Sequence, residues 1–242
     1  MPQKLAPITL PTISETGQYS AIDPLDSRYY DAEIAKYLSE RSRIAYYAYV
    51  EAALAHTLAD FGVCSQAIAD KIEAASRLVT AEEVYAHEKV TNHHTKALVN
   101  AIKDHLDDDA KPFVHFGATS FDIISTGEAY QLRTTIHELL IPRLRALIET
   151  LLELTDKYAE TTQVGRTHGQ HAVPITFGFL TAGYVSRLGG SMTSLQILAD
   201  KLPGKFSGAV GAYNALSVFV DDPMKFETTL LENLGLPIAP YS

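Results

Sequence analysis

The sequence contains no tryptophan and one cysteine, Cys64, among its 242 residues. One cysteine cannot form an intrachain disulfide, so a reducing compartment fits best and we expect the cytoplasm. Basic residues are also few, since 20 Lys and Arg stand against 29 Asp and Glu, a formal net charge of −9. This balance argues against binding of nucleic acid, which needs a basic surface. A small anionic ligand remains possible because a pocket needs only a few local cations.

Long uncharged apolar runs are missing as well. The first 18 residues include Lys4, Glu15 and several prolines, and they lack the continuous apolar stretch of a secretory signal. The nearest candidate for a membrane span, 173–199, has Arg187 as its only charge but also contains glycines and hydroxyl residues. We interpret it as a buried helix of a soluble protein, and we expect no membrane partner.

The composition is that of a globular protein, 46% hydrophobic and 20% charged, which excludes wholesale disorder. Helical periodicity dominates and alternating strand patterns are scarce, so we predict an all-α fold. Loops are expected at 163–173 and in the glycine-containing segment 204–211. The predicted helices cover about 31–61, 65–77, 80–107 with a break near 91–92, 120–157 with a kink at Pro142, 174–199 starting at Pro174, and 223–234.

The segment that follows Pro174 is nearly uncharged, so it should be buried on most of its faces. A small domain would have difficulty surrounding such a helix. We therefore expect an interior position in a helical bundle that other chains or further sequence complete. The predicted organisation is an N-terminal helical domain, 1–118, followed by the first part of a long-helix bundle, 119–242.

Several of the nine histidines stand in polar, turn-like segments, namely His93, His94, His115, His168 and His171. Imidazole can move protons at neutral pH, so histidines that converge on one pocket would suit general acid–base catalysis. Helix capping or a surface position is the alternative for most of them. Two of them, His168 and His171, have the spacing of a metal pair, but no recognised ligand set accompanies them. We predict neither a metal nor a cofactor.

Two further segments suit an anionic ligand. Thr119 and Ser120 read as the start of a helix, where they could hold an anion or act only as a cap. Arg28, beside Tyr29, could bind a phosphate or carboxylate, or could be an ordinary surface arginine. The glycine-containing segment 204–212 matches neither a P-loop nor a dinucleotide fingerprint, so we expect a helix-to-helix turn there.

Five segments, in this order, resemble motifs of the fumarase/aspartase superfamily. They are Asp23 to Tyr29, Thr91 to Ala97, Val114 to Asp122, Gly165 to Ala172, and Ser207 to Asn214, and the resemblance covers about 20–242. The Arg28–Tyr29 pair and the element Thr119 to Asp122 favour the branch whose substrate is adenylosuccinate. A relative similar to the carboxymuconate cycloisomerases is the alternative within the superfamily.

The resemblance implies a homotetramer in which long helices form a central bundle and each active site combines three subunits. It implies a carbon–nitrogen lyase of purine biosynthesis that converts adenylosuccinate into AMP and fumarate, and that also acts on the related succinyl-carboxamide ribotide. His168 is expected to be the general acid and His93 to hold the substrate and tune that acid. The substrate-binding residues it implies are Arg28, Tyr29, Asn92, His94, Thr119, Ser120, Thr167 and Gln170, with His115 and His171 as further candidates.

Two features depart from the family pattern. His94 stands where the family has a substrate-contacting aspartate. The family's mobile Gly-Ser-Ser loop, whose serine is thought to be the general base, has no counterpart in the 242 residues. The chain is therefore expected to correspond to the N-terminal half of a family member and to be nearly inactive alone. A catalytically inactive helical scaffold is the alternative from another functional class.

Overall fold

The computed structural model describes residues 5–12 and 26–240. Its contacts group the chain into two compact units, which we describe separately. Unit 1 comprises Met1–Thr134 together with Lys201–Ser242, and unit 2 is Thr135–Asp200. Helices dominate both units, and the described residues contain one two-stranded sheet, which confirms the predicted all-α fold class. The predicted domain boundary at 118/119 stays a prediction.

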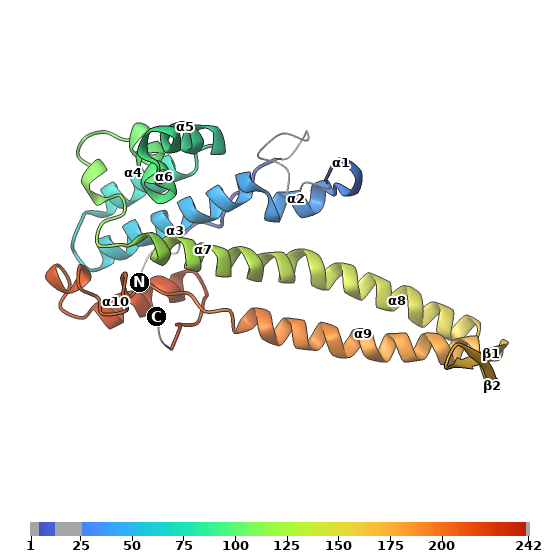
Figure 1. Ribbon diagram of the computed structural model, residues 1–242. Helices are drawn as coiled ribbons and strands as arrows, with labels where there is room; N and C mark the ends of the chain where they lie inside the picture. The colour runs from blue at the N-terminus through green and yellow to red at the C-terminus, as the bar shows by residue number, and fades with distance from the viewer. Residues whose placement is uncertain (1–4, 13–25, 241–242) are drawn as a thin grey trace. The chain divides into compact units, whose positions relative to one another are not determined.

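Unit 1 is a cluster of helices around the long helix α3 (Figure 1). Tyr46, Val50, Leu54 and Leu58 of α3 are all fully buried, because the helix is apolar on more than one face. The elements of this unit are α1 (Asp26–Tyr29), α2 (Ala32–Leu38), α3 (Glu40–Asp60), α4 (Gln66–Ser76), α5 (Ala81–Thr91), α6 (His94–Asp104), η1 (Lys111–Phe113), α7 (Ser120–Thr135), η3 (Leu216–Val218) and α10 (Pro223–Asn233).

The helix ends of unit 1 follow local capping chemistry. The helix start predicted at about residue 80 is confirmed, and Thr80 and Glu83 form a capping box there, at the start of α5. Asn92 adopts a left-handed conformation with φ 49°, which produces the predicted break between α5 and α6. The helix expected over 31–61 is, by contrast, divided at Ser39. This residue is extended, and its hydroxyl accepts a hydrogen bond from the Ser42 N–H at 3.4 Å, so it caps α3.

The glycine-containing loop 204–211 is more than a helix-to-helix turn, because side chains of α7 hold it in place. The backbone N–H of Lys205 donates to Thr126 Oγ1 at 3.0 Å, and the Thr126 hydroxyl donates to the Lys205 carbonyl at 2.7 Å. Lys205 Nζ lies 3.0 Å from Asp122 Oδ1, and the Gly208 N–H donates to the same oxygen at 3.1 Å. The loop is thereby tied to the first turns of α7.

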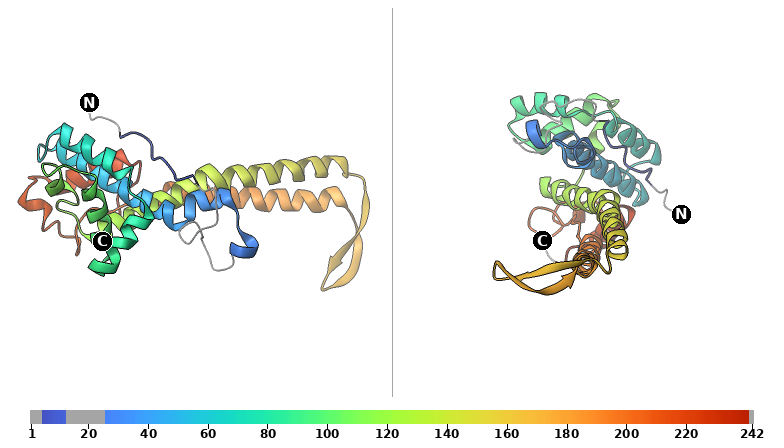
Figure 2. Two further views of the ribbon diagram at one scale, coloured as in Figure 1. Left: turned by 90° about the horizontal axis from the view of Figure 1, so that it is seen from above. Right: turned by 90° about the vertical axis from the view of Figure 1, so that its right-hand side faces the viewer.

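Unit 2 is an antiparallel helix pair with a β-hairpin between the two helices. Figure 1 and the left view of Figure 2 show α8 running alongside α9. The elements are the π-helical turn η2 (Ile136–Leu140), α8 (Ile141–Lys157), β1 (Thr162–Thr167), β2 (Gln170–Thr176) and α9 (Phe177–Asp200).

Helical residues run from Ser120 to Lys157 as predicted, and the irregularity expected near Pro142 is the π-helical turn that precedes it. Proline lacks the N–H that a helix interior uses, so it is best accommodated where the hydrogen-bond pattern changes. The predictions of a loop at 163–173 and of a helix starting at Pro174 were wrong. That segment forms the hairpin, and Pro174 pairs with Val164 in its ladder. A two-stranded sheet has only edge strands, where proline is tolerated.

Burial of α9 on most of its faces is not achieved within the chain. Its buried residues are Gly178, Thr181 and Ala199. Phe179, Ile197 and Leu198 are 70%, 50% and 58% exposed. Completion of the bundle by other chains therefore stays a prediction. None of the described helices combines the length and apolarity needed to cross a membrane.

The contact between α7 and α3 gives a test of the packing. A Cβ atom on Gly127 would lie 2.5 Å from Cδ1 of Tyr47, whose ring is buried and whose hydroxyl donates to Glu128. We expect Gly127→Ala to lower the free energy of unfolding by about 1–3 kcal/mol, the usual effect of overpacking, measured by urea denaturation. Gly189→Ala is the matched control, because a Cβ there meets no atom within 4 Å. Equal destabilisation by both variants would contradict the packing.

Candidate active site

A hollow of about 520 Å³ in unit 1 brings together residues of two predicted motifs. His93 reaches it from the start of α6, and Thr119 and Ser120 reach it from the start of α7. The volume lies in the range of small-molecule pockets. The complete lining consists of His93, Thr95, Lys96, Val99, Lys103, Val114, His115, Ala118, Thr119 and Ser120.

His93 caps α6 with its ring. Nδ1 accepts a hydrogen bond from the Lys96 N–H at 3.2 Å, which satisfies one of the backbone donors at the helix start. A neutral imidazole that accepts at Nδ1 carries its proton on Nε2. The side chain is exposed, so Nε2 is available as a donor. Capping and proton donation are compatible in this geometry.

His115 is held by a buried glutamate that the sequence interpretation missed. The backbone N–H of His115 donates to Glu51 Oε2 at 3.0 Å, and the ring Nδ1 of His115 lies 2.6 Å from Glu51 Oε1. Burial lowers the pKa of His115, but the adjacent Glu51 carboxylate outweighs burial and the pKa is raised. A lone glutamate between the apolar neighbours Val50 and Ala52 of a buried helix was the signal that could have identified this partner.

The start of α7 is held by an aspartate, and a cap by the hydroxyl of Thr119 or Ser120 stays a prediction. Asp122 Oδ2 accepts a hydrogen bond from the Thr119 N–H at 2.9 Å, and the Asp122 side chain is buried. Thr119 and Ser120 themselves line the hollow. Their hydroxyl groups and the positive end of the α7 dipole suit an anionic ligand there.

Three other predicted binding residues lie outside the lining of the hollow. Arg28 and Tyr29 are on the short helix α1, where both side chains are exposed, Tyr29 to 71%. Asn92 is the left-handed residue between α5 and α6 and is also exposed. Their proposed contacts with substrate stay predictions.

His94 also stays outside the hollow, because it faces an aromatic pair. Its ring centroid lies 6.0 Å from that of Tyr47 and 5.9 Å from that of Tyr85. Its Nδ1 is 3.3 Å from Glu88 Oε2, whereas its buried Nε2 has no hydrogen-bond partner among the described residues. The position that holds aspartate in the family pattern is therefore used here for packing between α3, α5 and α6.

The remaining candidates belong to unit 2, at the tip of its hairpin. Thr167 pairs with Gln170, and the two residues between them, His168 and Gly169, have φ of 51° and 71°. Positive φ at both positions is typical of a two-residue type I′ turn, and the glycine meets this requirement without strain. The side chains of Thr167, His168, Gln170 and His171 are exposed. That these side chains join His93, Thr119 and Ser120 in one active site stays a prediction.

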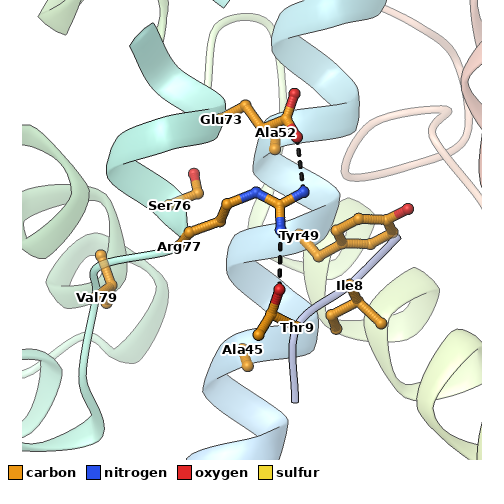
Figure 3. Close-up of a pocket in the computed structure, with 9 residues that line it drawn as sticks. All are labelled: Ile8, Thr9, Ala45, Tyr49, Ala52, Glu73, Ser76, Arg77 and Val79. Atoms are coloured by element: carbon orange, nitrogen blue, oxygen red, sulfur yellow. Dashed lines mark hydrogen bonds and ion pairs between the residues drawn. The ribbon is translucent and has the colours of Figure 1, made fainter. Parts of the chain in front are cut away.

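A smaller cavity lies where the segment 5–12 packs against α3 and α4 (Figure 3). Arg77 spans it and donates to Thr9 Oγ1 at 3.0 Å and to Glu73 Oε1 at 2.7 Å. Its volume of about 40 Å³ suits a water molecule but not a substrate. Among the described residues, no group of three or more His, Cys, Asp or Glu side chains is arranged to hold a metal ion.

Comparison with known proteins agrees with these motifs. The adenylosuccinate lyase of Methanocaldococcus jannaschii is 31% identical over 93% of this chain and 48% of its own length. That of Pyrococcus abyssi is 35% identical over 89% of this chain and 48% of its length. The N-acetyl-S-(2-succino)cysteine lyase of Enterococcus italicus is 31% identical over 78% of this chain. The chain thus spans about half the length of these curated relatives.

Solved structures share the fold. The 3-carboxy-cis,cis-muconate lactonizing enzyme of Pseudomonas putida matches 90% of the chain and 50% of its own, with 30% identity and a TM-score of 0.80. A fumarate lyase of Mesorhizobium sp. BNC1 matches 88% of the chain and 50% of its own, with 26% identity and a TM-score of 0.79. A family model described as Lyase matches residues 24–240. The chain therefore belongs to this lyase family, within the fumarase/aspartase superfamily that its motifs resemble.

Proposed function

We propose that the whole protein containing this chain is an adenylosuccinate lyase, which converts adenylosuccinate into AMP and fumarate in purine biosynthesis. The observation that carries the proposal is the convergence of His93, His115 and the Thr119–Ser120 helix start on one hollow. This hollow combines a proton donor with groups that suit anions, as a succinylated nucleotide requires. The curated adenylosuccinate lyases among the relatives support the same substrate.

The reaction is a β-elimination. A base removes a proton from the carbon next to a carboxylate, the C–N bond breaks, and the leaving purine nitrogen gains a proton from His168. The intermediate carries excess negative charge on that carboxylate, so hydrogen-bond donors around it accelerate the reaction. Thr119 and Ser120 supply such donors from the start of α7, and the Nε2–H of His93 supplies another. We place the general base outside these 242 residues.

The other predicted contacts complete the proposed site. Arg28 and Tyr29 bind the phosphate group, and Asn92, Thr167 and Gln170 hold the rest of the substrate. His94 acts through its packing beside Tyr47 rather than through direct contact with the substrate. The related succinyl-carboxamide ribotide presents the same succinyl-amine linkage and is the second proposed substrate. No cofactor takes part in this chemistry.

A sister reaction is the second candidate function. The Enterococcus relative is named as a lyase of a succinylated cysteine, and its identity to the chain, 31% over 192 residues, equals in percentage that of the Methanocaldococcus adenylosuccinate lyase over 227 residues. The same hollow could hold the succinyl part of either substrate. The leaving group, sulfur or nitrogen, would then decide which residues outside the hollow are needed.

The assay that tests the proposed function measures release of AMP and fumarate from adenylosuccinate by the whole protein. We expect turnover, and a fall in kcat of about 10²–10⁴-fold in His168→Ala, the usual effect of losing a general acid. His87→Ala is the matched control. The His87 side chain hydrogen-bonds to Asp104 and lies outside the hollow. The 242-residue chain alone should show almost no turnover.

A second variant separates capping from catalysis at His93. Asparagine also caps helices well, so His93→Asn should keep α6 intact while removing the imidazole.

Release of fumarate from N-acetyl-S-(2-succino)cysteine but not from adenylosuccinate would replace the first function with the second. No turnover of either compound by a folded whole protein would leave the scaffold alternative.

Self-association as a homotetramer is the proposed assembly. The exposed apolar side chains of α9, Phe179, Ile197 and Leu198, support it, because such a face is stable in water only when covered. Sedimentation equilibrium of the whole protein should give a mass near four times that of one chain. A compact monomer at micromolar concentration would contradict the proposal.

The charge of the hollow depends on Glu51. The pKa of His115 is raised in the folded protein above the ordinary value of about 6.5, so its protonation stabilises the fold fully below about pH 6.5. This stabilisation is lost as the pH rises through the folded pKa. We expect Glu51→Gln to lower the pKa of His115, because burial then acts without the opposing charge, measured by NMR titration. Glu73→Gln, which alters the partner of His56 instead, should leave the His115 titration unchanged.

A further inference from the structure

Two lysines of α6 share one wall of the hollow. Lys96 and Lys103 are seven residues apart, which is two helical turns, so their side chains project from the same face of α6. Both line the hollow, together with His115 and the start of α7. Neither lysine belongs to the set of binding residues that the family resemblance implies.

The carboxylates near this hollow already have partners. Glu51 pairs with His115 at 2.6 Å, and Asp122 pairs with Lys205 at 3.0 Å. Within the described part of the chain, no carboxylate lies within ion-pair distance of the Lys96 or Lys103 ammonium group. The wall formed by α6 therefore carries two ammonium groups that form no direct ion pair with a described carboxylate.

What distinguishes Lys96 and Lys103 is their place in one hollow. Some lysines of unit 1 pair with a carboxylate, as Lys36 does with Glu33 and Lys111 with Asp108, whereas Lys89 and Lys225 have no such partner among the described residues and line no part of the hollow. Burial lowers the pKa of Lys103 and the nearby charge of Lys96 lowers it further, and these two effects outweigh the Glu51 carboxylate, which acts in the opposite direction. Two like charges held together without a partner destabilise each other, and an anion between them would relieve that repulsion.

We propose that Lys96 and Lys103 form a subsite for a doubly negative oxyanion group of the substrate, either a phosphate monoester or a dicarboxylate. The proposal rests on the proposed function, in that it takes the hollow to be the substrate site. A lysine ammonium acts as a compact point charge, so the pair sets the charge of the group that binds rather than its exact orientation. Thr119 and Ser120, which also line the hollow, supply the directional hydrogen bonds.

Calorimetric titration of the protein with inorganic phosphate and with fumarate tests this subsite. We expect at least one of the two anions to bind, with a Kd raised about tenfold in Lys96→Met and in Lys103→Met, the effect of losing one charge-assisted contact. Methionine keeps the length of the apolar stem, and urea denaturation verifies the fold of each variant. Lys111→Met is the control, since Lys111 is paired with Asp108 and lies outside the hollow, and it should bind as the wild type does.

Binding of phosphate alone would assign the subsite to the nucleotide end of the substrate, and binding of fumarate alone to the succinyl end. The proposal is overturned if neither anion binds, or if the double variant Lys96→Met/Lys103→Met binds as tightly as the wild type. The titration needs no turnover. Anion binding that depends on the lysines in a protein that does not cleave adenylosuccinate would therefore reject the proposed reaction and retain the subsite. Cleavage of adenylosuccinate with an unchanged KM in both lysine variants would reject the subsite and retain the proposed reaction.

Discussion

A buried carboxylate at the start of α7 holds together two segments that are far apart in the sequence, 119–122 and 205–208. Asp122 accepts hydrogen bonds from the Thr119 N–H and the Gly208 N–H and pairs with Lys205. A buried charge is tolerated only when it is paired and hydrogen-bonded, so these contacts must form together. The position of the helix start that lines the hollow and the path of the loop after α9 both depend on them.

Glu51 is a second buried carboxylate that holds a residue lining the hollow, His115. It is buried in α3 and binds His115 through both the backbone N–H and the ring. Glu51 and Asp122, which both bind residues of the hollow's lining, are thus paired with cationic groups within the protein. The cations of α6, Lys96 and Lys103, remain without a carboxylate partner among the described residues. A chain with a net charge of −9 consequently presents a locally positive hollow.

The accuracy of the sequence predictions followed the range of the interactions involved. The helix start near 80 and the break near 91–92 depend on residues within one helical turn, Thr80 with Glu83 and Asn92, and both predictions were confirmed. The hairpin was predicted as a loop because its strands lack clean alternation, a consequence of exposure on both sides and of the irregularity between Val164 and Arg166. The division at Ser39 was missed because the apolar periodicity continues across it.

The sequence by itself determined the helical fold class, most helix ends, and the family, because periodicity, capping residues and ordered motifs are local or additive signals. It also identified His93, Thr119 and Ser120, which the structure brings to one hollow. Only the tertiary structure decided that Glu51 holds His115, that His94 packs between two tyrosines, and that Lys96 and Lys103 lack carboxylate partners among the described residues. Those facts depend on which side chains meet across separate helices, and the charge of a residue in a sequence does not say which neighbour will neutralise it.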